Sequence, residues 1–270
     1  MYREHTREEK IEAFGRLLDV MDRLRAECPW DRKQTNETLR TNSIEEVFEL
    51  ADAIVKDDRH EIMKELGDVL LHVVFYSKIG SETRDFDIVD VCDNEVAKLK
   101  FRHPHIYGNT VADTEEKVLE NWEQIKLKEK DGNKRVLSGV PSGLPSLIKA
   151  YRIQEKARNV GFDWQDKGDV WAKVREELDE LETELKAEDN EKSSQELGDF
   201  IFSVINAARL YKLNPDTSLE KTNQKFINRF NYVEEHSIRQ GKPLTEMTLE
   251  EMDGLWNEAK EKEKENIKKY

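Results

Sequence analysis

The chain carries the same acidic pattern twice, once in each half. In the first copy E-E-V-F-E is followed by K-E-L-G-D, and sixteen positions separate Glu49 from Glu65. In the second copy E-E-L-D-E is followed by Q-E-L-G-D, and sixteen positions again separate Glu180 from Glu196. Because each residue turns an α-helix by about 100°, acids three or four positions apart share one side of a helix. The pattern therefore predicts two pairs of helices, each carrying a stripe of carboxylates.

Apolar residues surround these acids along the sequence. After Asp68 the chain continues as V-L-L-H-V-V-F, and after Asp199 it continues as F-I-F-S-V-I. A helix that is apolar around most of its circumference is buried, so we expect the acids to be drawn into the interior. Carboxylates that share a place of low dielectric repel one another unless a cation compensates their charge. Oxygen ligands without cysteine or paired histidine favour a hard cation, and we predict Mg²⁺, with Mn²⁺ as the alternative.

A single acidic stripe would indicate little, because 38% of the residues are charged and most such stripes face solvent. The apolar surroundings and the second copy with identical spacing favour a chemical role.

Some residues near the acids are better explained by a structural role. Ser43 is expected to cap the first acidic helix with Glu46 as its capping-box partner. His72 and Tyr76 lie on the acidic stripe of the first copy only, so we interpret them as packing or polar-network residues.

The overall composition excludes several classes of protein. The net charge of −14 argues against broad binding to nucleic acid or to a membrane surface. The two cysteines, Cys28 and Cys92, do not make a disulfide framework. The N-terminal residues M-Y-R-E-H-T-R-E-E-K do not form a signal peptide, and no apolar run approaches the roughly 20 residues that span a bilayer. We therefore expect a soluble, cytoplasmic protein.

Helical periodicity dominates the chain, and no convincing strand pattern appears. We predict helices over about 6–27, 87–101, 147–159 and 218–240, acidic helices from about 43, 170 and 191, and further helices from 114 and 248. Residues 131–145 contain three glycines and two prolines and are typical of a linker. This linker separates two expected domains, residues 1–130 and residues 146–270.

Basic and aromatic residues repeat in step with the acids. In each half a lysine and an arginine, and then a tryptophan and a lysine, stand one helical turn apart: Lys98, Arg102, Trp122 and Lys126, and later Lys225, Arg229, Trp256 and Lys260. The offset between matching residues of the two halves changes little along the chain, which indicates a tandem duplication. A divalent cation held by carboxylates can also bind the oxygens of a polyphosphate, and a lysine with an arginine can bind phosphate oxygens. Taken singly, such basic pairs are usually surface residues, and such tryptophans usually anchor a core.

Together these motifs resemble the MazG nucleoside triphosphate pyrophosphohydrolases. The resemblance rests on E-E-x-x-E at 176–180, E-x-x-D at 196–199 and N-x-K-F-x-x-R-F at 223–230, with C-P-W-D and R-H-P-H in the first half. It covers essentially the whole chain. It implies an all-α fold of two tandem four-helix units, commonly in a homodimer. It also implies Mg²⁺-dependent hydrolysis of nucleoside triphosphates to monophosphate and pyrophosphate, with water attacking the α-phosphate.

The resemblance implies roles for residues of the second half, which is the catalytic half of such two-domain proteins as a rule. The implied metal ligands are Glu177, Glu180, Glu196 and Asp199. The implied nucleotide contacts are Lys225, Arg229, Trp256 and Lys260. We expect Glu176 or Glu177 to orient or deprotonate the attacking water.

The first half offers a second candidate site, made of Glu45, Glu46, Glu49, Glu65, Asp68, Lys98 and Arg102. It departs from N-x-K-F-x-x-R-F, because the chain reads N-E-V-A-K-L-K-F-R-H from Asn94. Three roles stay open for this half: a weaker catalytic site, a regulatory nucleotide site, or a dimerisation domain.

Two other interpretations of the whole chain also stay open. One is a non-catalytic helical scaffold that binds nucleotide or metal or mediates dimerisation. The other is a di-iron carboxylate bundle, which requires Glu-x-x-His on two helices. The matching segments here are Glu65-x-x-Asp68 and Glu196-x-x-Asp199, so the histidine is absent.

Overall fold

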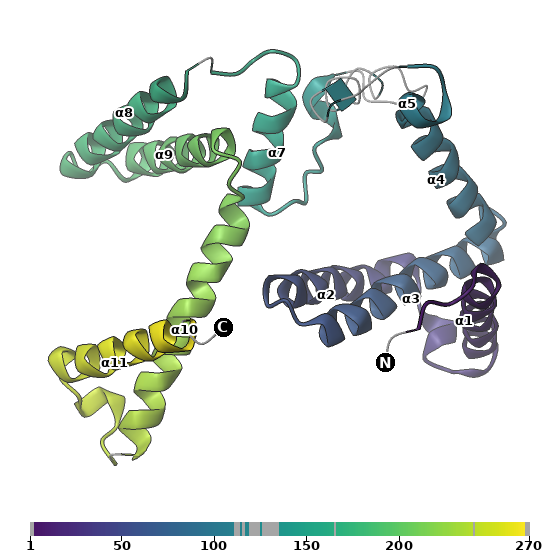
Figure 1. Ribbon diagram of the computed structural model, residues 1–270, viewed down its shortest axis with the longest axis horizontal. Helices are drawn as coiled ribbons and strands as arrows, with labels where there is room; N and C mark the ends of the chain where they lie inside the picture. Colours follow the sequence, from purple (N-terminus) through teal and green to yellow (C-terminus); the bar gives the residue numbers. More distant parts are fainter. Residues whose placement is uncertain are drawn as a thin grey trace. The chain divides into compact units, whose positions relative to one another are not determined.

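The computed structural model describes residues 3–110, 135–164, 166–239 and 241–267, together with positions 114, 117, 118 and 125. All regular secondary structure in these residues is helical, which confirms the predicted all-α class (Figure 1). The chain forms two compact units, Met1–Gly132 and Asn133–Tyr270. Trp122, Lys126 and most of the helix expected from Thr114 lie outside the described residues. No helix in the described part of the chain is long and apolar enough to cross a membrane.

The first unit is built on the antiparallel helix pair α2 (Asn36–Val55) and α3 (Arg59–Thr83). The first helix, α1 (Arg7–Glu27), packs against α3, and the 3₁₀ turn η1 (Asp31–Lys33) connects it to the pair. After α3 come α4 (Ile88–Arg102) and the short α5 (Pro104–Tyr107). Proline can occupy the first turn of a helix but not its interior, so Pro104 separates α4 from α5.

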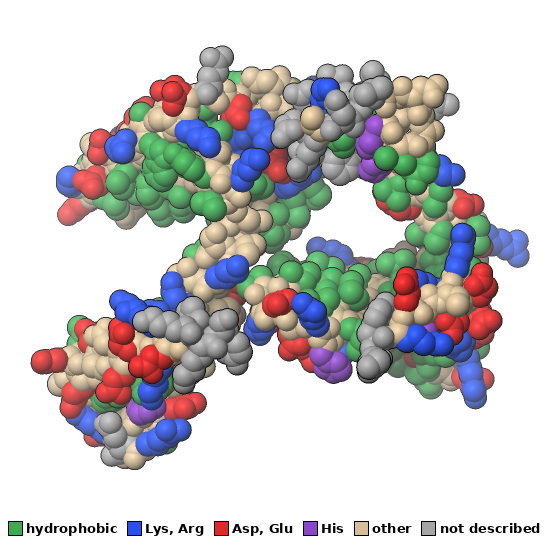
Figure 2. All heavy atoms as spheres, in the orientation of Figure 1, with side chains coloured by type: hydrophobic (Ala, Val, Ile, Leu, Met, Phe, Trp, Pro, Cys, Tyr) green, Lys and Arg blue, Asp and Glu red, His purple; other side chains and the backbone are tan. Residues whose placement is uncertain are grey.

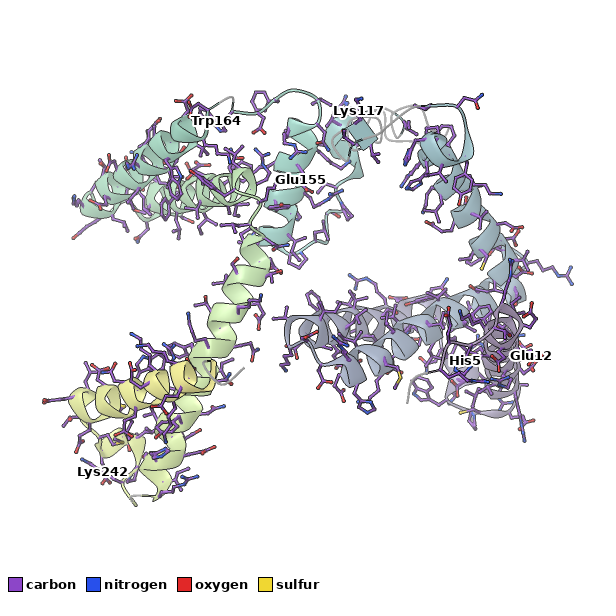
Figure 3. The ribbon with its side chains drawn as sticks, in the orientation of Figure 1. His5, Glu12, Lys117, Glu155, Trp164 and Lys242 are labelled. Atoms are coloured by element: carbon purple, nitrogen blue, oxygen red, sulfur yellow. The ribbon has the colours of Figure 1, made fainter. Side chains whose placement is uncertain are left out.

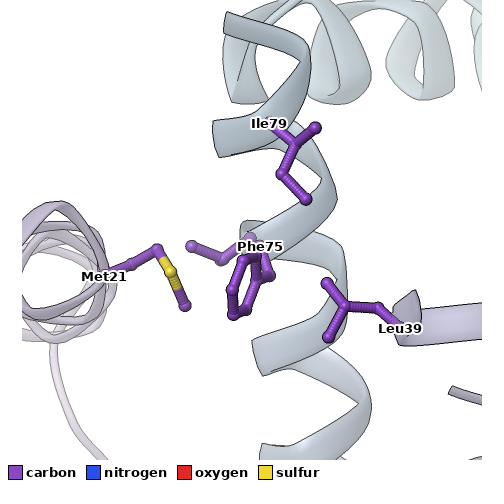
Figure 4. Close-up of a cluster of buried hydrophobic side chains, with 5 residues drawn as sticks. Met21, Leu39, Phe75 and Ile79 are labelled. Carbon is purple, nitrogen blue, oxygen red and sulfur yellow. The ribbon is translucent and has the colours of Figure 1, made fainter. Parts of the chain in front are cut away.

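A compact apolar core joins α1, α2 and α3 (Figure 4). Its buried members are Met21, Leu39, Val74, Phe75 and Ile79. On α3, Phe75 follows Glu65 by ten residues, which is about 15 Å of helix axis. The core therefore holds the C-terminal part of α3, and the acidic N-terminal part of α3 lies outside this core and packs against α2.

The N-cap of α2 lies eight residues earlier than predicted. Thr35 is its N-cap, and the Thr35 hydroxyl accepts a hydrogen bond from the backbone N–H of Thr38 at 3.2 Å. The Thr38 hydroxyl accepts in return from the backbone N–H of Thr35 at 2.8 Å. This reciprocal capping box satisfies two backbone donors at the helix start. The prediction that Ser43 caps the helix with Glu46 is wrong, because Ser43 lies inside α2.

The second unit repeats the helix pair as α8 (Lys167–Lys186) and α9 (Asn190–Leu210). Before it come the 3₁₀ turn η2 (Val136–Gly139) and α7 (Ser146–Arg158), which packs against α9. After it come α10 (Pro215–Arg239), the 3₁₀ turn η3 (Leu244–Glu246) and α11 (Leu249–Ile267). Val170, Val174 and Ala207 form a small buried core between α8 and α9. In Figure 1, α10 leads away from the α8–α9 pair, and α11 folds back along α10.

Many apolar side chains of the two helix pairs remain exposed. Phe48 on α2 is 52% exposed, and Leu197 and Ile201 on α9 are 46% and 44% exposed. Figure 2 shows hydrophobic side chains gathered over both pairs. The expectation that these helices are buried all round is wrong for a single chain. Each helix pair buries the sides on which its two helices contact each other and the side that contacts α1 or α7. The remaining apolar sides would need another protein surface to cover them.

Candidate functional site

Three acids meet between α8 and α9 and form what we call the second acid cluster. Glu177, Glu196 and Asp199 each offer one carboxylate oxygen, and these oxygens lie within 4.8 Å of one another. Glu177 is buried, Glu196 is half-buried and Asp199 is exposed. Burial, followed by the charges of Glu180 and Asp199, raises the pKa of Glu196. A hard cation would relieve this repulsion, and the oxygen-only donor set fits such an ion.

An open groove of about 670 Å³ lies beside the second acid cluster. Its lining includes Glu176, Glu180 and Glu196. The carboxylate of Glu180 is exposed and is not among the three oxygens that meet. The predicted metal ligands thus divide into three acids that come together and one that faces the groove.

The first unit contains a matching group, the first acid cluster. Glu46, Glu49 and Glu65 offer carboxylate oxygens that lie within 4.8 Å of one another. Glu65 is only 7% exposed, and its Oε2 has no hydrogen-bond partner among the described residues. Burial and then the charge of Glu49 raise the pKa of Glu65, and burial and then the charge of Asp68 raise the pKa of Glu46. An unpartnered carboxylate oxygen beside two further acids fits a bound cation.

The two clusters use corresponding positions of the repeat. When the two copies of the acidic pattern are aligned, Glu46 corresponds to Glu177 and Glu65 corresponds to Glu196. The third member differs, because Glu49 completes the first cluster whereas Asp199, the counterpart of Asp68, completes the second. Glu45, also predicted for the first site, is exposed on α2.

A polar network lies next to the first acid cluster. The Ser43 hydroxyl is 3.0 Å from His72 Nδ1 and 2.6 Å from the Tyr76 hydroxyl. Burial lowers the pKa of His72 even though Asp68 is nearby. His72 and Tyr76 are hydrogen-bonded to Ser43, which confirms their interpretation as network residues.

The predicted nucleotide contacts of the second half lie on α10 and α11, and we call them the basic set, with the tryptophan included: Lys225, Arg229, Trp256 and Lys260. The Arg229 guanidinium lies 5.6 Å from the Trp256 ring centroid and donates a 2.7 Å hydrogen bond to Glu263. The Phe226 ring lies 5.0 Å from the Trp256 ring. Lys225 and Lys260 are exposed. Trp256 therefore packs between Phe226 and Arg229 and supports the arginine.

The second acid cluster and the basic set lie in different parts of the second unit. α11 packs along α10, away from the α8–α9 pair (Figure 1). In the first unit Lys98 and Arg102 both lie on α4, and Lys98 forms an ion pair with Glu95. A single chain thus gathers the acids but does not bring the basic set of the second unit to them.

Comparison with known proteins assigns this arrangement to a family. Residues 34–107 and 165–234 both match the MazG nucleotide pyrophosphohydrolase domain. Each match contains one acid cluster. The chain belongs to the MazG family.

Relatives of this MazG chain cover nearly its full length. It is 39% identical over 257 residues to the nucleoside triphosphate pyrophosphohydrolase of Escherichia coli (strain K12), which covers 93% of this chain and 98% of that protein. It is 40% identical over 250 residues to the Thermotoga maritima nucleoside triphosphate pyrophosphohydrolase/pyrophosphatase MazG, which covers 92% and 95%. The Bacillus subtilis protein YabN is 42% identical over 266 residues, 96% of this chain and 54% of that protein.

A lysine that the sequence analysis did not single out contacts the second acid cluster. Lys173 Nζ lies 2.7 Å from Glu177 Oε1 and 2.9 Å from Glu176 Oε1. Hydrogen bonds first to Glu177 and then to Glu176 raise the pKa of Lys173, so it stays charged. The signal was present in K-V-R-E-E, because a lysine three and four residues before two glutamates lies on the same helix side.

Proposed function

We propose that this chain hydrolyses nucleoside triphosphates to monophosphate and pyrophosphate at the second acid cluster. The observation that carries the proposal is the meeting of Glu177, Glu196 and Asp199 within 4.8 Å beside an open groove. These acids, with Glu180 at the groove, would hold a divalent cation, which we take to be Mg²⁺ with Mn²⁺ as the alternative. Bound there, the cation supplies positive charge for the phosphate oxygens of the substrate.

Glu176 and Glu177 are the acids that would handle the attacking water at the α-phosphate. Both stand on α8, and Glu176 lines the groove. An ionised carboxylate can accept a proton from water or hold it in line for attack. Lys173 now donates to both carboxylates, so the water must replace Lys173 as the partner of the one that acts.

A second copy of the chain would complete the site. The α8–α9 pair leaves apolar side chains uncovered, and the basic set stands on α10 and α11, which lie away from it. In a symmetric dimer the same two surfaces meet twice. The basic set of one copy would then face the second acid cluster of the other and bind the substrate phosphates through Lys225, Arg229 and Lys260.

The first acid cluster would bind a cation as well. The unpartnered Glu65 Oε2 supports this assignment. We assign catalysis to residues 146–270 and not to residues 1–130, because N-x-K-F-x-x-R-F is complete only in the second half.

Product analysis tests this function. The protein is incubated with Mg²⁺ and mixed nucleoside triphosphates, and the products are separated by anion-exchange chromatography. Monophosphate with pyrophosphate is the expected result. Diphosphate with phosphate would overturn the proposed reaction, and absence of turnover would favour the non-catalytic scaffold.

Matched variants test the assignment to the second acid cluster. Glu196→Gln and Glu65→Gln make the same change at corresponding positions of the two halves. We expect Glu196→Gln to abolish turnover and Glu65→Gln to retain it. Loss of turnover in Glu65→Gln alone would place catalysis in the first unit.

A further inference from the structure

Arg175 is a cation that lines the open groove beside the second acid cluster. The groove follows one face of α8, because its lining residues on that helix recur every three or four positions. α8 begins shortly after Trp164, which Figure 3 labels, and Arg175 lies about two turns into the helix. The arginine therefore shares a helix face with Glu176 and Glu180, which also line the groove.

The guanidinium of Arg175 leaves most of its hydrogen-bonding capacity unused. Its one hydrogen bond within the described residues runs from Nη1 to the Trp171 carbonyl and is 3.5 Å long. Arg175 forms no ion pair with a carboxylate of the described chain, and the neighbouring Glu176 is paired with Lys173 at 2.9 Å. Because arginine carries five N–H donors in a planar fork, Arg175 keeps donors for a ligand in the groove.

The first unit lacks this cation at the corresponding position. When the two copies of the acidic pattern are aligned, Ile44 stands where the second unit has Arg175. The groove of about 480 Å³ beside the first acid cluster is lined by a different cation, Lys56, whose Nζ is paired with Asp52 at 2.6 Å. Arg175 thus distinguishes the groove of the half to which we assign catalysis.

A triphosphate in this groove needs positive charge beyond that of one divalent cation, because the groove itself is lined with carboxylates. Arg175 precedes Glu180 by five residues, about 7.5 Å along the axis, and its long side chain can contact phosphates bound beside that acid. We propose that Arg175 binds phosphate oxygens of the substrate, from the same copy of the chain that supplies the acids. This inference rests on the proposed function of the second acid cluster.

Binding of a triphosphate analogue tests this contact separately from the chemistry. The full chain is titrated in a calorimeter with α,β-methylene-ATP, in which a methylene group replaces the oxygen of the bond to be cleaved. Saturating Mg²⁺ keeps changes in cation affinity out of the comparison. Arg175→Ala is expected to weaken binding about tenfold, because it removes charge-assisted hydrogen bonds to phosphate.

Lys186→Ala is the matched control. Lys186 is an exposed cation on the same helix, and it does not line the groove. We expect Lys186→Ala to bind the analogue like the wild type. Equal analogue binding by Arg175→Ala and Lys186→Ala would overturn the proposed contact.

Further outcomes separate this contact from the reaction. Arg175→Lys keeps the positive charge without the planar fork, and it should lose less affinity than Arg175→Ala. This partial recovery excludes general unfolding as the cause of the loss. Analogue binding that depends on Arg175, without any turnover of ATP, would keep the contact and overturn the proposed reaction. Turnover of ATP by a chain whose analogue binding does not depend on Arg175 would keep the reaction and overturn the contact.

Discussion

At the residue scale, the two halves differ in a residue that lies beside their acids. Lys173 contacts Glu176 and Glu177, whereas the corresponding position of the first half is Asn42. Helical spacing was sufficient to predict the acids that meet, because it fixes which side chains share one side of a helix. It could not predict which three of the four acids come together in each half, since that depends on how closely the paired helices approach.

Lys173 is paired with the carboxylate of Glu177, which is also a proposed ligand of the cation. Lys173→Asn makes the second unit like the first, and we expect the Mg²⁺ concentration for half-maximal turnover to fall about threefold, since partly exposed ion pairs contribute little. A Mg²⁺ titration of the hydrolysis rate measures this. Lys186→Asn removes an exposed ion pair with Glu182 and serves as the control. An unchanged or higher Mg²⁺ requirement in Lys173→Asn would contradict a competition between Lys173 and the cation for the Glu177 carboxylate.

The raised pKa values of Glu65 and Glu196 predict how pH changes stability. Burial and neighbouring acids favour the protonated form in the folded state. Without a cation, the stabilising contribution is therefore present below the ordinary pKa of 4.5 and is lost as pH rises through the raised pKa. We expect Mg²⁺ to raise Tm at about pH 7 and to have little effect at about pH 4. Thermal melts with Mg²⁺ and with EDTA check this, and an equal effect at both pH values would contradict it.

At the element scale, the presence of the helices was predictable, but the start of α2 and the burial of the acidic helices were not; α8 and α10 each begin three residues before the predicted position. The helices α1, α4 and α7 begin and end within one or two residues of the predicted ranges. The start of α2 was missed because the T-x-x-T box at Thr35 precedes the apolar periodicity that guided the prediction. Periodicity shows that a helix is apolar on most sides, but it does not show whether the same chain covers those sides.

The capping box of α2 predicts a specific loss of stability. Thr35→Ala removes the side-chain acceptor for the Thr38 N–H and should destabilise the first unit by about 1 kcal/mol. Thr35→Ser keeps the hydroxyl and should be close to wild type. Urea unfolding of both variants measures the difference. Equal stability of the two would contradict the assigned cap.

At the scale of the whole molecule, the acids and the basic set belong to different parts of the second unit. The repeat predicted both the acids and the basic set, because the spacing between neighbouring members of each group is the same in the two halves. The distance between them depends on the path of α10 and α11, for which the sequence has no periodic signal. Because of this separation, we propose that a second copy of the chain completes the site.

Subunit mixing tests that dependence. Glu196→Gln removes an acid and Arg229→Ala removes a phosphate-binding residue, so each variant alone should be inactive. In a symmetric dimer with shared sites, each mixed dimer has one intact site and one site that carries both changes. Because about half of the dimers are mixed after coexpression, we expect about a quarter of wild-type activity. Activity assays with light scattering measure recovery and oligomeric state. A dimer without recovery would contradict shared sites.

The most direct test of the account is the position of the attack by water. The reaction is run with Mg²⁺ and ATP in water labelled with heavy oxygen, and the products are analysed by mass spectrometry. Attack at the α-phosphate places the label in the monophosphate and leaves the pyrophosphate unlabelled, which is the result we predict. Label in the pyrophosphate would mean attack at the β-phosphate and would contradict the proposed arrangement of the acids and the substrate.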